Sequence, residues 1–489
     1  MQVLLLAAGV TSMACGGGGS AGVQGQPGAD AALDSAADSG RAEGAADSSI
    51  TESATTDSGA DATQSDGSSG DASVSQVPPY DVHGSDRLAC AFGPGDTTVT
   101  TIGPSVPHGD ALPFTHIVFL MMENRSFDSY MSKLPSYGVT DVDVADESYS
   151  NPDPGPPLAT VNRFHETRYC TADTTHDWGP VHLQYDDGNM DGFVVTNDPG
   201  GARAMGFYDQ TDIPYYYWLS ATFSMSDRHF SSLLGPTWPN RFFFYGATSW
   251  GRTSTPDTPP LNQNKILNEL DTAGRTWNIY SEGTTSFAIV FGPMYAGTSM
   301  SQFFTDVASD QLPDVSILDP TFSGSTEDDE HPPTNIQLGQ KLSASVLSAL
   351  MAQPSVWAKT VFIQTYDEHG GYYDHVPPPA ACIPDGYTPP DYAFDRYGIR
   401  VPIMIASPYA KAGYVSHLVT DLTSVTRFIE NRFDLPAMTV RDANAWPLLD
   451  MFDFVSPPFA TPPGGMPDTT PDQAHIDWCA NNPPGTGMP

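Results

Sequence analysis

Two pairs of oxygen-bearing side chains directly follow the two most apolar runs of the sequence. The run IVFLMM leads into Glu123 and Asn124, and the run VFIQTY leads into Asp367 and Glu368. If the runs are neighbouring strands, these side chains meet at the carboxyl edge of the sheet, where sites of α/β proteins form. Crowded carboxylates repel one another, and a hard divalent cation neutralises them. The pattern therefore predicts a cation site, and a salt-bridged structural cluster explains it equally well.

A third segment, Gly235–Arg241 (GPTWPNR), carries a hydroxyl group between conformationally restricted residues. One glycine and two prolines around Thr237 predict a tight turn that holds the hydroxyl rigidly. The planar guanidinium of Arg241 matches the geometry of phosphate oxygens. A plain β-turn is the alternative, and the segment alone favours that interpretation.

Four short apolar or β-branched runs predict the strands that must position these residues. The runs are Ile117–Met122, Trp277–Tyr280, Val361–Tyr366 and Val401–Ala406. Unbroken apolar runs are typical of strands buried on both faces of a sheet. Helical patterns lie between them, at Asn262–Ala273, Ile336–Met351 and Thr423–Phe433. This alternation predicts an α/β fold with a mostly parallel central sheet and helices on both faces.

These segments resemble, in the same order, those of the bacterial phosphoesterase family that includes the non-haemolytic phospholipases C and an acid phosphatase. The resemblance covers roughly residues 113–454. It implies an alkaline phosphatase-like fold. The matching segments are HIVFLMMENRSFDSY (116–130), HDW (176–178), MDGF (190–193), GPTWPNR (235–241), EHPP (330–333), TYDEHGGYYDHVPPP (365–379), RVPIMIASPYAKAGYVSH (400–417), and residues 424–433 and 441–454.

The resemblance also implies a metal site. Glu123, Asn124, Asp367 and Glu368 match the positions that hold the metal, and Thr237 matches the nucleophile, which is also expected to bind the metal. A threonine is found there in the phospholipases and a serine in the phosphatase. Oxygen-dominated ligands favour Ca²⁺, Mg²⁺ or Mn²⁺, and nearby histidines leave Zn²⁺ open.

Three histidines, His176, His331 and His369, match residues that line the family's phosphate pocket. His331 is the expected acid for the leaving group, and His176 and Arg241 are expected to bind substrate with it. A structural role is the alternative for each histidine. The implied mechanism is in-line attack by Thr237, which gives a phospho-threonine intermediate that water then hydrolyses.

Three functions are compatible with this pattern. The leading hypothesis is a metal-dependent, phospholipase C-like phosphodiesterase acting on a phospholipid, and Thr237 favours it over an acid phosphatase acting on a small phosphate ester. The sequence Ser129–Ser132 departs from the family's usual continuation, which leaves substrate preference open. A non-catalytic cell-surface binding protein is the alternative of another class, and it would be indicated by loss of a metal ligand or of the nucleophile.

The first 77 residues differ in composition from the rest. Residues 1–15 predict an export signal whose end, SMACG, resembles a bacterial lipobox with Cys15 as the lipidated residue. An ordinary cleaved signal is the alternative. Residues 16–77, rich in Gly, Ala, Ser and Asp, predict a disordered acidic tether, and residues 78–489 the phosphoesterase domain. We therefore expect an exported cell-envelope lipoprotein, anchored in the outer membrane through Cys15, or alternatively a secreted protein.

Charge and cysteine content add two expectations. The formal net charge of −38 argues against a nucleic-acid partner and against electrostatic docking on anionic lipid. Four cysteines of the predicted domain indicate two disulfides in an exported chain, with three pairings that the sequence does not distinguish. These are Cys90, Cys170, Cys382 and Cys479.

Overall fold

The computed structural model describes residues 78–482 and 484, apart from residues 156, 158, 198, 261, 284, 285, 325 and 390. The predicted export signal, Cys15 and the predicted tether at 16–77 lie outside the described residues and stay predictions. Within the described part of the chain, no helix has the length and apolar character needed to cross a membrane.

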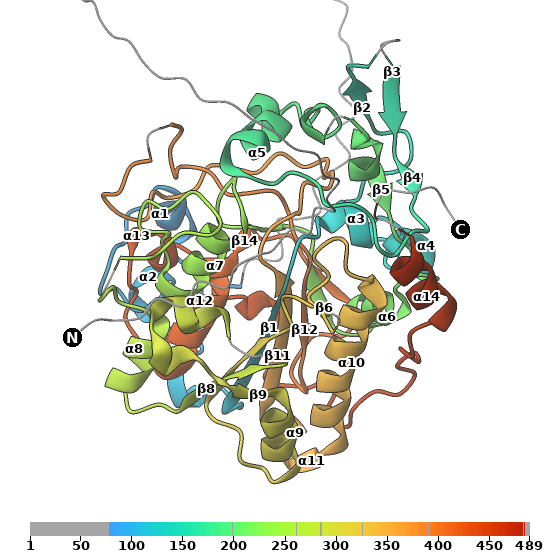
Figure 1. The fold of residues 1–489 in the computed structure, drawn as a ribbon. Helices are drawn as coiled ribbons and strands as arrows, with labels where there is room; N and C mark the ends of the chain where they lie inside the picture. The colour runs from blue at the N-terminus through green and yellow to red at the C-terminus, as the bar shows by residue number, and fades with distance from the viewer. Residues whose placement is uncertain are drawn as a thin grey trace, which may run out of the picture. The chain divides into compact units, whose positions relative to one another are not determined.

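An eight-stranded sheet lies at the centre of the domain (Figure 1), in the order β13-β6-β12-β11-β1-β10-β8-β9. Neighbouring strands run parallel except in the two pairs that β12 makes. The predicted mostly parallel α/β fold is confirmed. The strands are β1 (His116–Met122), β6 (Ser224–Ser226), β8 (Trp277–Ser281), β9 (Thr298–Ser299), β10 (Val315–Asp319), β11 (Thr360–Tyr366), β12 (Ile403–Ala406) and β13 (Tyr414–Ser416).

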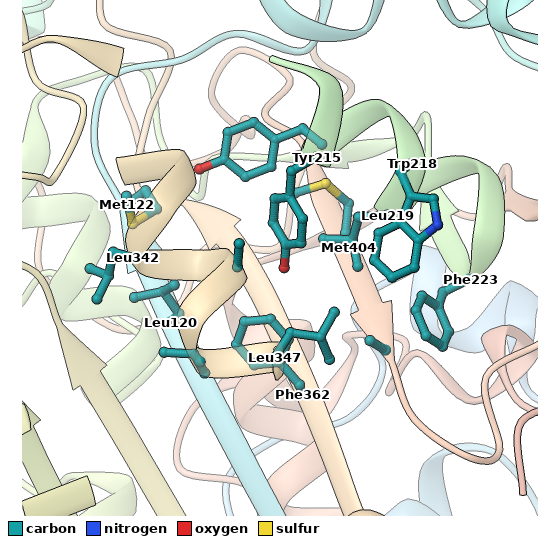
Figure 2. Packing of buried hydrophobic residues seen from close by; sticks show 14 of the residues in the cluster. Leu120, Met122, Tyr215, Trp218, Leu219, Phe223, Leu342, Leu347, Phe362 and Met404 are labelled. Atoms are coloured by element: carbon teal, nitrogen blue, oxygen red, sulfur yellow. The ribbon is translucent and has the colours of Figure 1, made fainter. Parts of the chain in front are cut away.

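Helices cover both faces of this sheet. Consecutive side chains of β1 point to opposite faces and pack in two different hydrophobic cores. Leu120 packs in the core that contains Leu219 and Leu347, with Phe362 of β11 between the layers (Figure 2). Phe119 points the other way, against Phe244 at a ring distance of 4.4 Å. The helices of these layers are α6 (Pro214–Thr222), α9 (Met300–Ala308) and α10 (Ile336–Ala352) on the first face and α7 (Thr237–Gly246), α8 (Ile266–Thr272) and α12 (Leu422–Phe433) on the second.

All four predicted strands and all three predicted helices are present, with shifted ends. Strand β12 starts at Ile403, two residues later than predicted, because Pro402 has no N–H for the ladder. The remaining elements are shorter. They are α1 (Gly84–Leu88), α2 (Thr98–Thr101), α3 (Phe127–Met131), α4 (Leu134–Tyr137), α5 (Trp178–Tyr185), α11 (Pro354–Trp357), α13 (Val440–Ala443), α14 (Gln473–Asn481), and the paired strands β2 (Ser150–Asp153) with β3 (Ala159–Asn162), β4 (Phe164–His165) with β5 (Gly206–Phe207), and β7 (His229–Phe230) with β14 (Thr420–Asp421).

Two disulfides join segments that are distant in the sequence. Cys90 is bonded to Cys382 and Cys170 to Cys479, across 292 and 309 residues respectively. The two predicted disulfides are confirmed, and the structure supplies the pairing. Each closes a long loop and so removes conformational entropy from the unfolded chain.

Candidate active site

The two acidic segments meet at the carboxyl ends of β1 and β11. The strands are parallel neighbours in which Met122 pairs with Tyr366, so Glu123 and Asp367 both follow the same register position. The backbone N–H of Asp367 donates to the carbonyl of Met122 at 3.1 Å. Oδ1 of Asp367 accepts from the backbone N–H of Asn124 at 3.3 Å. The predicted meeting of these segments at one edge of the sheet is what the structure shows.

Arg241 on α7 connects this edge to Thr237. Its Nε donates to Oδ2 of Asp367 at 3.0 Å, and its Nη2 lies 3.1 Å from Oε1 of Glu123. Residues four apart in a helix lie on the same face, so Thr237 stands one turn before Arg241 on the side of these carboxylates. The buried guanidinium of Arg241 bonds protein carboxylates. Its expected contact with substrate therefore stays a prediction.

The predicted tight turn at Thr237 is wrong, because Thr237 is the first residue of α7. Pro236 and Pro239 are compatible with the helix because N–H groups of a first turn have no intrahelical partner. Asn240 was not found by sequence reasoning. Its Oδ1 accepts two backbone N–H groups of the preceding loop, and its Nδ2 donates to the carbonyl of Gly235 at 2.8 Å. This side chain therefore fixes the loop that leads into Thr237.

Several buried oxygen atoms at this edge have no hydrogen-bond partner among the described residues. They include Oδ1 of Asn124, together with its Nδ2, and Oε1 of Glu368. Asn124 has a left-handed backbone (φ 63°), and Gly370 packs so closely that a Cβ there would lie 2.6 Å from it. Unpaired buried polar atoms are destabilising. These orphaned oxygens fit a hard divalent cation held by the predicted ligands.

The charge balance at this edge points the same way. Burial, together with Glu123 and Glu368, raises the pKa of Asp367 well above its usual range, although Arg241 opposes this shift. One guanidinium does not offset the neighbouring carboxylates, and a divalent cation would. Glu368 differs, because burial raises its pKa but His176, His369 and the backbone N–H of Gly370 together lower it, so the net direction is downward.

Two further carboxylates at the site were missed by sequence reasoning. Asp319 ends β10, lies 3.9 Å from Nη1 of Arg241, and has its pKa raised by burial to about 6. The short apolar run VSILD before it was the signal that could have revealed it. Asp329 accepts the backbone N–H of Glu123 through its carbonyl, and its buried Oδ2 has no partner among the described residues. No sequence pattern marks Asp329.

His176 and His331 present one ring nitrogen each toward the site. Nδ1 of His176 lies 2.7 Å from the carbonyl of Thr174, and Nδ1 of His331 lies 2.6 Å from the carbonyl of Pro332. Each Nδ1–H donates to its carbonyl, which leaves Nε2 for other partners. The two rings meet edge to face at 5.8 Å. Burial lowers the pKa of His176, but Glu368, 3.8 Å from its Nε2, leads the carboxylates that raise it to about 9. His176 is therefore a cation at neutral pH, suited to an anionic substrate.

His369 has different surroundings. Its Nε2 is 2.8 Å from Oε1 of Gln184 and its Nδ1 is 3.4 Å from Oε2 of Glu368. Burial lowers its pKa, which keeps the ring neutral. Both nitrogens face protein groups, so these contacts orient Glu368, and the predicted catalytic role of His369 stays a prediction.

A buried ion-pair network supports the loop after β11. His375 bonds Asp128 through Nδ1 at 2.6 Å and Asp143 through Nε2 at 3.0 Å. Asp374 accepts from Nε of Arg400 at 2.8 Å. Asp128, Asp374 and His375 lie close enough to share a metal ion, but the Arg400 guanidinium and the cationic His375 already balance the two carboxylates. The network is therefore a structural one, and it connects α3 to this loop.

Stability should depend on pH through His375. Burial lowers its pKa, but Asp128 and Asp143 raise it to about 9. A raised histidine pKa stabilises the fold fully below the unfolded value of about 6.5, and this contribution is lost as the pH rises through 9. His375→Gln should lower the free energy of unfolding by about 2–3 kcal/mol at about pH 6 and by much less at about pH 9.5. Urea denaturation measures both, and an equal loss at the two pH values would contradict the assignment.

The sequence model of the phosphoesterase family matches residues 114–436. This range contains β1, α7 and β11, and with them Thr237 and the four predicted metal ligands. The chain belongs to the phosphoesterase family. It is a hydrolase that acts on phosphoric ester bonds.

Curated relatives are phospholipases. The chain is 31% identical over 426 residues to phospholipase C B of Mycobacterium tuberculosis (strain ATCC 25618 / H37Rv), covering 73% of this chain and 80% of the relative. It is also 31% identical over 399 residues to non-specific phospholipase C6 of Arabidopsis thaliana, covering 74% and 76%. A solved structure of an alkaline phosphatase superfamily protein from Vibrio parahaemolyticus is 9% identical, with a TM-score of 0.34 over 68% of this chain and 69% of that one. That score is too low to support an argument.

Proposed function

We propose that the protein is a phospholipase C-like phosphodiesterase, which releases a phosphorylated head group from a phospholipid. The observation that carries the proposal is the position of Thr237, one helical turn before Arg241, whose guanidinium bonds both Glu123 and Asp367. Thr237 also begins a ten-residue helix, and the positive end of the helix dipole favours a phosphate there. Relatives named phospholipase C at 31% identity support this substrate class.

A divalent cation is part of the proposal, held by Glu123, Asn124, Asp367 and Glu368. When bound, it would lower the pKa of the Thr237 hydroxyl and stabilise negative charge on the phosphate oxygens. The orphaned oxygens of Asn124 and Glu368 support this assignment. Because the donors are oxygens, we propose Ca²⁺, Mg²⁺ or Mn²⁺ in preference to Zn²⁺.

The chemistry of the protein residues follows from their positions. Thr237 Oγ gives its proton to solvent and attacks phosphorus, and the bond from phosphorus to the diacylglycerol oxygen breaks. His331, acting as the imidazolium, donates its Nε2 proton to this departing oxygen and keeps its Nδ1–H on the Pro332 carbonyl, while the cationic His176 binds a phosphate oxygen. Water then attacks phosphorus from the opposite side and passes a proton to His331. The phosphorylated head group is released, and Thr237 Oγ leaves and regains its proton from solvent.

Comparison of two substrates tests the proposal. With metal-loaded protein, kcat/KM for phosphatidylcholine should exceed that for p-nitrophenyl phosphate by at least about tenfold. Release of phosphocholine and diacylglycerol identifies the bond that is cut. A preference for p-nitrophenyl phosphate would indicate the acid phosphatase instead, and no turnover of either ester would favour the binding protein.

We also propose that the protein is exported and anchored in the cell envelope through a lipid on Cys15. The sequence SMACG and the two disulfides support this, because disulfides persist in oxidising compartments. Mass spectrometry of the mature N-terminus tests it, and a mature chain without a diacylglyceryl group on Cys15 would contradict it.

A further inference from the structure

Exposed apolar side chains lie on α5 and on the loop of residues 383–396, which contacts α5. Helix α5 is near the top of Figure 1. Leu183 on α5 is 59% exposed and Tyr392 on the loop is 54% exposed. The ring of Tyr392 stacks on His182 at 3.7 Å, and Trp178 lies 6.3 Å from Tyr392. We call these four side chains, Trp178, His182, Leu183 and Tyr392, the aromatic rim.

The aromatic rim borders the segment that carries the nucleophile. A Cβ added to Gly235 would lie 3.0 Å from Cε3 of Trp178, so the indole packs directly on the residue two before Thr237. His176 precedes Trp178 by two residues and belongs to the site. The rim is therefore continuous with the site.

A second aromatic residue of the same loop flanks α7 from another side. Tyr387 is 44% exposed and packs over Gly251. The loop of Gly251 continues to Thr255, whose Oγ1 accepts the backbone N–H of Trp238, the residue after Thr237. The side chains of Trp178 on α5 and of Tyr387 thus pack against the loops that precede and follow α7.

Tyr392 is held in its exposed position at a conformational cost. Its backbone is left-handed (φ 62°), which is unfavourable for a residue with a bulky side chain. Stacking on His182 and the bond from Nε1 of Trp178 to the carbonyl of Asp391, at 3.3 Å, fix this arrangement. Amphipathic aromatic side chains with one wet edge are enriched where proteins meet the lipid–water interface.

The charges around the aromatic rim favour a zwitterionic lipid surface over an anionic one. The ranges 177–187 and 383–396 contain one arginine, Arg396, and no lysine. Anionic lipid surfaces attract basic segments and repel acidic ones, whereas a zwitterionic surface lets aromatic rings enter without that penalty. The aspartates of these ranges are Asp177, Asp186, Asp187, Asp385, Asp391 and Asp395.

We propose that the aromatic rim docks the enzyme on a zwitterionic phospholipid surface, so that a lipid head group passes from the bilayer directly to Thr237. The inference rests on the proposed phospholipase function and adds the surface that delivers the substrate. Docking brings the scissile ester to the site without full extraction of the acyl chains into water, which is strongly unfavourable.

The test uses the full chain with Cys15→Ala, so that no lipid anchor contributes to binding. The rim variant is Tyr392→Asn with Leu183→Gln, because Asn tolerates the left-handed backbone and Gln preserves helix propensity. The control is Val455→Asn. Val455 is 92% exposed and follows Phe454, which stacks on Phe114 just before β1, at the opposite end of the sheet.

Two readouts separate docking from chemistry. The rim variant should bind sonicated phosphatidylcholine vesicles, and hydrolyse them, at least about tenfold less well than the parent. Its turnover of monomeric dihexanoyl-phosphatidylcholine should be unchanged, and the control should match the parent in both. Vesicle binding measured by co-sedimentation does not depend on turnover.

Several results would overturn the inference. These are unchanged vesicle binding by the rim variant, no vesicle binding by the parent, and tighter parental binding to phosphatidylglycerol than to phosphatidylcholine. If the parent bound no vesicles, the aromatic rim would be interpreted as a binding surface for a protein partner instead. If the parent binds vesicles through the rim but hydrolyses neither lipid, the proposed function fails while the docking surface stands.

Discussion

Thr237→Ala is expected to lower kcat/KM for a phosphodiester by roughly 10³-fold or more, with little change in stability or metal content. The variant removes the hydroxyl that is expected to form the bond to phosphorus. It deletes only a hydroxyl and a methyl group at the start of α7, and Asn240 and the carboxylates keep their contacts. Steady-state kinetics, thermal unfolding and metal analysis measure the three quantities.

Thr237→Ser is the matched control, because it keeps a hydroxyl group at the same position. It should retain turnover within about tenfold of the wild-type value. Wild-type activity in Thr237→Ala would show that another group attacks phosphorus. If Thr237→Ala lost the bound metal as well as activity, the main role of Thr237 would be to bind the metal and not to attack phosphorus.

Exhaustive chelation of divalent cations is expected to lower turnover by roughly 10³-fold or more, and Ca²⁺, Mg²⁺ or Mn²⁺ should restore it. Without a cation, the threonine hydroxyl is a weak nucleophile, and the buried carboxylates repel an anionic substrate. The matched pair of variants is Asp367→Asn and Asp319→Asn. Both carboxylates are buried beside Arg241, but only Asp367 is a predicted ligand.

Metal content measured by mass spectrometry distinguishes the two variants. Asp367→Asn should lose the bound cation, and Asp319→Asn should keep it. Full activity in protein shown to contain no divalent metal would contradict the proposed cation, and loss of metal only in Asp319→Asn would place the site elsewhere.

The central strands could be predicted because both faces of the sheet are buried. That burial requires unbroken apolar runs such as the one in β1, which stand out in any sequence. Strands β6, β9 and β13 have only two or three residues, too few for a periodic signal. The antiparallel direction of β12 is set by the connections of the chain, and a run of apolar residues contains no information about direction.

The meeting of the two acidic segments could be predicted because each directly follows a strand. Glu123 and Asp367 were found because each stands at the end of an apolar run. Asn240 and Asp329 were missed because their roles arise from hydrogen bonds that form only after folding. Thr237 was recognised, but its local structure was predicted wrongly, since prolines occur both in turns and in the first turn of a helix.

The most direct test of the account is acid quenching during turnover of a phosphodiester, followed by mass spectrometry of the peptide that contains Thr237. The mass expected on Thr237 is that of the phosphorylated head group, which should appear before steady state and be absent from Thr237→Ala. The same adduct on another residue, or turnover at full rate with no covalent adduct at any quench time, would show that Thr237 is not the nucleophile.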